Sequence, residues 1–217
     1  MSKIQVDTID TRSGTATMQI GSTNTSTINI GVSGDTVNIP SNVTLDVASG
    51  ATLDATGATV TGITSGITEA DQWRLTTNFT GDASPIASNW ERTDTSGWGR
   101  IGTGMTESSG VFTFPSTGIW YVAFNFFANA STAQLYATPS IEVTINNSAY
   151  APASYADVSF YGGTSYNSSM SQYFVDVTDV ANVKVRFVVD AVSTNTTTIG
   201  SSTNTGTGVT FIRLGDT

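Results

Sequence analysis

The sequence predicts an all-β protein, in which an N-terminal repetitive β-shaft is followed by an antiparallel jelly-roll sandwich. Three observations predict this class. Short units that alternate apolar and polar residues repeat through residues 13–66. After Trp73, about eight apolar runs of strand length alternate with turn-forming residues. Charged residues make up only 12% of the chain, and the abundant Ser, Thr, Asn and Gly suit strand surfaces and turns.

The first segment, residues 1–12, is expected to attach the chain to a larger particle. It carries both charge signs and the apolar residues Ile4, Val6 and Ile9, which we expect to make the anchoring contacts. A frayed terminus is the alternative.

Residues 13–66 repeat the pattern Thr, apolar, polar, apolar, and we expect each copy to form a minimal strand. The copies begin at Thr17, Thr27, Thr36, Thr44 and Thr52, with a degenerate copy at Thr59. Two medium apolar side chains per copy cannot offset a backbone ordering cost of about 1–2 kcal/mol per residue in a lone chain. We therefore predict a trimeric shaft whose shared axis is lined by Ile20, Ile30, Ile39 and Val47. A single-chain β-helix and a Ser/Thr-rich linker are the alternatives.

Residues 67–89 are expected to form a junction and a first strand, and residues 90–217 the head. Within the junction, Thr68 could cap one helical turn that ends at Gln72. Residues 191–207 are polar and are expected to form a long connection. The strands are expected at 73–79, 111–114, 119–127, 140–146, 155–160, 170–177, 182–190 and 208–214.

The stretch from Gly110 to Phe127 contains the most aromatic strand of the sequence, and both of its faces are apolar. Side chains of a strand alternate between faces. We expect one face, formed by Trp120, Val122, Phe124 and Phe126, to fill the sandwich. The other face, with Tyr121, Ala123 and Phe127, is expected to contact neighbouring subunits.

The same stretch resembles the central signature of the C1q/TNF-like domain. Gly110, Phe112, Thr113, Gly118 and Trp120 occupy the matching positions, although Pro115 comes two residues early. The resemblance covers about residues 90–217. It implies a ten-stranded jelly roll that forms trimers about a threefold axis and serves in binding rather than catalysis.

The order of attachment segment, β-repeat and sandwich head also resembles virion fibres and spikes of tailed marine bacteriophages. This resemblance implies a homotrimer on the virion, held by capsid, portal or tail proteins through residues 1–12. The protein would be made in the host cytoplasm and exposed on the particle. The head would attach to a host surface glycan or protein. A bacterial surface adhesin is an alternative.

Catalysis is not expected, because the chain has no histidine and no cysteine. Two carboxylates suffice for glycoside hydrolysis, so a polysaccharide depolymerase is the enzymatic alternative. Its candidate acids are Glu69 with Asp71, Asp157, and Asp176 with Asp179. No cofactor is expected, and structural calcium has no dense acidic loop to support it.

The surface chemistry points to a ligand other than nucleic acid. The net charge of −9 and the lack of a basic patch disfavour nucleic acid, and no apolar run is long enough to insert into a membrane. Aromatic residues among Ser and Gly form adaptable recognition surfaces. The candidates for a receptor surface are Trp98, Tyr155, Tyr161 and Tyr166.

Overall fold

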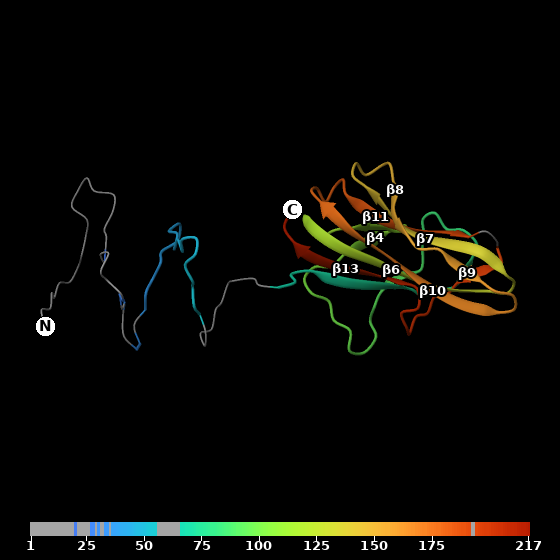
Figure 1. Cartoon of the computed structure of the whole chain (residues 1–217), viewed down its shortest axis with the longest axis horizontal. Coiled ribbons are helices and arrows are strands. Elements are labelled where there is room, and N and C mark those ends of the chain that lie inside the picture. Colours follow the sequence, from blue (N-terminus) through green and yellow to red (C-terminus); the bar gives the residue numbers. More distant parts are fainter. Residues whose placement is uncertain are drawn as a thin grey trace, which may run out of the picture. The chain divides into compact units, whose positions relative to one another are not determined.

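The computed structural model describes residues 20, 27, 28, 30, 33, 34, 36–55, 66–191 and 194–217. The chain divides into two units, residues 1–60 and residues 61–217. Figure 1 shows the strands of the second unit. The first unit contains most of the repeat and the second contains the head. Ile4, Val6 and Ile9 lie outside the described residues.

The described residues of the repeat in the first unit form turns, not strands. One turn is closed by the amide of Val43, which donates to the carbonyl of Pro40 at 3.3 Å, and the next by Ala51 and Ala48 at 3.0 Å. Their third residues, Asn42 and Gly50, have φ of 63° and 84°, as a type II turn requires. The described residues of this unit contain no strand, so the expected strands do not form within one chain. The physical reason is that each copy lacks a partner strand and an apolar surface to pack on.

The head consists of two antiparallel sheets, and its described residues contain no helix. The first sheet has seven strands: β1 (Ala70–Leu75), β2 (Phe79–Thr80), β3 (Trp90–Arg92), β6 (Gly118–Ala130), β10 (Ser165–Val177), β12 (Thr196–Thr198) and β13 (Gly208–Gly215). The second has six: β4 (Thr106–Ser108), β5 (Val111–Thr113), β7 (Gln134–Thr144), β8 (Ala151–Tyr155), β9 (Val158–Phe160) and β11 (Lys184–Ala191).

Strand β6 is the centre of the seven-stranded sheet. It pairs along its whole length with β10, and its other edge pairs with β13 and β12. Strand β1 then joins β13 to β3. In the second sheet the order is β4-β5-β11-β7-β8, with β9 also paired to β7. Figure 1 shows β6, β10 and β13 in one layer and β7, β8 and β11 in the other. Non-consecutive neighbours in both sheets are the crossovers of a jelly roll.

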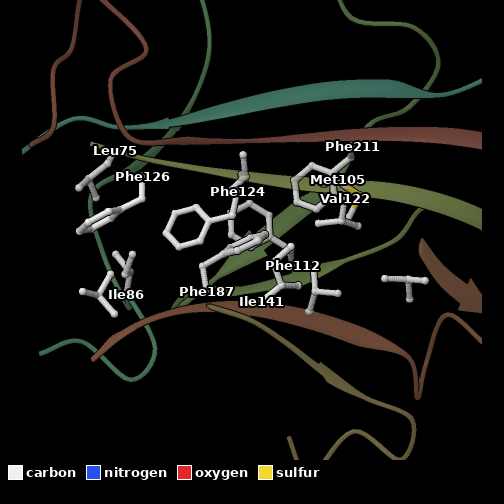
Figure 2. Packing of buried hydrophobic residues seen from close by; sticks show 14 of the residues in the cluster. Leu75, Ile86, Met105, Phe112, Val122, Phe124, Phe126, Ile141, Phe187 and Phe211 are labelled. Atoms are coloured by element: carbon white, nitrogen blue, oxygen red, sulfur yellow. The ribbon is translucent and has the colours of Figure 1, made fainter. Parts of the chain in front are cut away.

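A cluster of aromatic rings fills the space between the sheets. Phe112 lies at its centre, with ring centroids 5.3–5.5 Å from those of Trp73, Trp90, Phe187 and Phe211. Figure 2 shows Phe112, Phe187 and Phe211 pointing into this space from both sheets. Most of these pairs meet edge to face, the arrangement that the ring quadrupoles favour.

Strand β6 confirms the prediction for its inner face. The side chains of Trp120, Val122, Phe124 and Phe126 are fully buried in the core. The expected strands at 119–127, 170–177 and 208–214 are also present, as parts of β6, β10 and β13.

Two local expectations were wrong. The residues expected to form a helical turn, Thr68–Gln72, instead lead into β1, because pairing with β13 and the isolated bridge from Ala70 to Ile101 hold them extended. The expected connection 191–207 contains β12, which pairs with both β2 and β6. Its three threonines favour a strand, and tertiary pairing decides between strand and loop.

Replacing the central ring of the cluster tests this description of the core. Phe112→Ala should lower the free energy of unfolding by about 3–5 kcal/mol, because it leaves a cavity that four rings surround. Urea unfolding at one protein concentration measures the change. The matched control is Ile145→Ala, since Ile145 is exposed and should change stability by less than about 0.5 kcal/mol. Equal effects of the two substitutions on stability would contradict the assignment of Phe112 to the centre of the core.

Candidate functional site

The outer face of the seven-stranded sheet carries a patch of aromatic and apolar side chains, which we call the aromatic face. It consists of Tyr121 and Phe127 from β6 and Tyr166, Met170 and Phe174 from β10. Phe174 and Tyr166 are each 62% exposed, and Met170 is 56% exposed. Exposed aromatic and apolar side chains gathered on one sheet face are a feature of interaction surfaces.

The pairing of β6 with β10 creates the aromatic face. In this register Phe174 lies opposite Tyr121, and their ring centroids are 5.8 Å apart. Farther along, Phe127 stacks on Tyr166 at 5.9 Å with an interplanar angle of 25°. These contacts fix the rings in place while leaving one side of each β10 ring open to solvent.

A shallow pocket lies at one end of the aromatic face. It is lined by Tyr121, Gln172, Tyr173 and Phe174. The hydroxyl of Tyr121 donates to Oε1 of Gln172 at 2.8 Å, so the polar atoms of this end are paired with each other. The surface that this pocket offers to a binding partner is therefore mainly that of aromatic rings. Such a surface suits an apolar side chain of the partner.

The structure places the three predicted interface residues of the head on this outer face. Tyr121 and Phe127 belong to the aromatic face, and Ala123 lies between them with its small side chain already buried. Sequence reasoning missed Phe174 and Met170. The signal was present, because Met170, Gln172 and Phe174 alternate with the inward-facing Ser171 and Val175.

The four candidates for a receptor surface do not form one site. Tyr166 belongs to the aromatic face. Trp98 is half-buried and lines a hollow with Gln72 and Thr210, over β1 and β13. Tyr155 and Tyr161 are exposed, at the end of β8 and just after β9, and line separate hollows.

The paired acids Glu69 and Asp71 hold a loop in place. The carboxylate of Glu69 accepts the amides of Thr103 and Gly104 at 3.0 and 2.9 Å. Asp71 is 4% exposed and accepts hydrogen bonds from the indole of Trp73 and the amide of Met105. Asp71 also forms an ion pair with Arg92 at 3.1 Å. Both acids are thus committed to structure.

The other candidate acids have similar local roles. Asp157 accepts from the hydroxyl of Thr138 at 2.6 Å. Asp179 accepts from the amide of Ala181 and the side chain of Asn182 in the turn before β11. Asp176 is exposed on β10. No two of these candidates form a hydrogen-bonded pair with each other among the described residues.

A fully buried arginine, Arg74, stabilises the part of the head around β1. Arg74 is 1% exposed and donates to the carboxylates of Glu91 and Asp94 and to the hydroxyl of Thr95. Burial lowers the pKa of Arg74, but the hydrogen bonds to Glu91 and Asp94 outweigh it and the net shift is upward. The guanidinium therefore stays charged and fixes the loop after β3 against β1.

The predicted shaft residues are exposed in the single chain. Ile20, Ile30, Ile39 and Val47 are between 41% and 69% exposed. Leu45 and Leu53, which occupy the same place in successive repeats, are exposed as well. The described part of the repeat therefore has apolar side chains without an intramolecular partner surface.

Metal and membrane sites find no support in the described segments. In those segments no three acidic side chains come together in a way that could hold a metal ion. The same segments contain no helix that is long and apolar enough to cross a membrane.

Comparison with known proteins gives the fold family. No protein-family model matches the chain, and no curated protein matches it in sequence. The structure of Eiger TNF from S. frugiperda matches with a TM-score of 0.51 and 14% identity, over 68% of this chain and 93% of that one. A structure of murine APRIL at pH 8.0 matches with a TM-score of 0.47 and 11% identity, over 67% and 98%. The head thus has the TNF-like jelly-roll fold, on the strength of the first match.

Substitution of Asp71 tests whether its carboxylate holds the loop that contains Met105 in place. Asp71→Asn should cost about 3 kcal/mol of stability, because it removes a buried charge opposite Arg92 and turns an NH₂ group toward existing donors. Urea unfolding is the measurement. Asp190→Asn, at an exposed acid, should change stability by less than about 0.5 kcal/mol. An Asp71→Asn protein as stable as the Asp190→Asn protein would contradict the claim that Asp71 stabilises the head by holding this loop.

Proposed function

We propose that this chain is a structural virion protein, a homotrimeric fibre or spike of a tailed bacteriophage. Residues 1–12 would anchor it to capsid, portal or tail proteins. The head would be exposed for attachment to the host surface. The observation that carries the proposal is the aromatic face, a group of exposed aromatic and apolar side chains of the kind found at interaction sites.

A cyclic trimer provides the cover that the aromatic face needs. In a threefold ring the contacts are heterologous, so the aromatic face of one copy meets a different part of its neighbour. The C1q/TNF-like domain, which the stretch around Trp120 resembles, assembles in this way. The TNF-like fold of the head agrees with such an assembly.

The exposed apolar side chains of the repeat also support a trimer. Its apolar side chains are exposed in one chain, and its turns recur at regular places. Three chains side by side would bury these side chains along a common axis and supply the strand partners that one chain lacks. A shaft and a head whose exposed apolar side chains would both be covered in a trimer favour a fibre or spike over a free globular protein.

A role in binding is better supported than a depolymerase. Glu69, Asp71, Asp157 and Asp179 are each engaged in structural hydrogen bonds. A general acid and its partner base would need to face one open site. The aromatic face and the hollows of the head offer contact surface instead.

The mass of the purified full chain tests the assembly. Sedimentation equilibrium at micromolar concentration should give three times the 22.6 kDa of one chain. Phe174→Glu places a charge on the aromatic face, where Phe174 is 62% exposed, and should shift the protein toward monomers. Tyr161→Glu, at an exposed tyrosine outside the aromatic face, is the matched control and should leave the mass unchanged. A wild-type monomer would overturn the proposal.

Deleting residues 1–12 tests the anchoring role. The truncated protein should remain a soluble trimer, because the aromatic face and the repeat lie outside the deleted segment. It should no longer be incorporated into particles, as measured by its presence in purified virions. Incorporation at the wild-type level would show that another segment makes the attachment.

A further inference from the structure

A second surface of the head has the features of a ligand site. It is a hollow on the outer face of the six-stranded sheet, over β8, β7 and β11. Thr138, Ser140 and Glu142 point outward from alternate positions of β7, with the buried Ile141 between them. Val188 of β11 and Tyr155 of β8 lie directly opposite Ser140 in the two ladders. The hollow thus has a low floor at Ser140 and a higher edge at Tyr155.

Two tyrosines stand at the edge of the hollow. Tyr136 and Tyr155 are both exposed, and both line it. A tyrosine ring offers an apolar face together with a polar hydroxyl. The C–H face of a pyranose ring stacks on such a surface, and the sugar hydroxyls remain free for hydrogen bonds.

Fixed hydrogen-bond acceptors line the hollow beside the tyrosines. Asp157 is held by the hydroxyl of Thr138 at 2.6 Å, and Glu142 by Arg186 at 2.6 Å. Arg186 in turn lies over the ring of Tyr150 at 4.3 Å. Burial raises the pKa of Tyr150, against the opposing charge of Arg186, so this phenol stays neutral. Carboxylates held in this way accept hydrogen bonds from ligand hydroxyls without a large ordering cost.

The floor of the hollow contains a polar group. Ser140 is 7% exposed and lines the hollow. The alternation along β7 directs its hydroxyl into the hollow, away from the core. This hydroxyl is within reach of water, and a ligand hydroxyl can take the place of that water as its hydrogen-bond partner.

The charges in the hollow select among saccharides. Glu142, Asp157 and Asp190 line it, and Arg186 opposes only the first of them. The surplus of negative charge repels uronic and sialic acids. We infer that the hollow binds a neutral saccharide, which stacks on Tyr155 and bonds to Ser140 and Asp157. This inference deepens the proposed role in host attachment by naming the ligand class.

Binding by the full-length protein tests the inference. The probes are neutral lactose, maltose, cellobiose and chitobiose, with sialyllactose as the acidic comparison. At least one neutral probe should bind with a dissociation constant on the order of millimolar, measured by calorimetric titration. Tyr155→Ala should weaken binding by about tenfold or more, through loss of the stacking surface. Ser140→Ala should weaken it by about two- to tenfold while leaving the unfolding midpoint unchanged or raised.

Tyr161→Ala is the matched control, because Tyr161 is an exposed tyrosine that lies outside the hollow. It should bind the neutral probe as the wild-type protein does. The inference is overturned if no neutral probe binds at up to about 10 mM, if sialyllactose binds better than all of them, or if Tyr155→Ala and Ser140→Ala bind normally. The mass of the same samples separates the two proposals. A trimer that binds no neutral probe refutes only the saccharide site, whereas a monomer that binds one refutes only the trimeric fibre.

Discussion

Strand β6 carries apolar side chains on both of its faces, and the structure of the head depends on this. Its inner residues, such as Trp120 and Phe124, build the core and place it against Phe187 of the other sheet. Its outer residues, Tyr121 and Phe127, hold two rings of β10 in position. One strand therefore determines both how the sandwich closes and where its exposed apolar surface lies. A polar outer face on β6 would leave the sandwich intact and remove the reason for assembly.

The sequence was sufficient for the fold class and for the burial of β6, because both follow from side-chain alternation. It was not sufficient for the extent of the aromatic face. Met170 and Phe174 reach that face only because β10 pairs with β6 in one particular register, and a register between distant strands is not encoded locally. For the same reason the stacking of Tyr166 on Phe127 could not be expected from the sequence. The β12 strand was missed because its pairing with two other strands decides its conformation.

In the proposed arrangement, the head separates assembly from recognition by using its two sheets differently. The seven-stranded sheet presents rings with few unpaired polar atoms, which suits a permanent contact between copies. The six-stranded sheet presents tyrosines, carboxylates and the hydroxyl of Ser140, which suits a reversible contact with a polar ligand. The loops anchored by Asp71 and Arg74 lie beside β1 and keep that side of the first sheet rigid.

The accessibility of the aromatic face in the intact protein tests the central claim most directly. The chain has no cysteine, so Met170→Cys introduces a single thiol at the middle of that face. Burial between copies predicts that this thiol reacts with a maleimide far more slowly in the native protein than after denaturation. Tyr161→Cys, outside the face, should react rapidly in both states. Equal reaction rates of the two thiols in the native protein would contradict the claim that other copies cover the aromatic face.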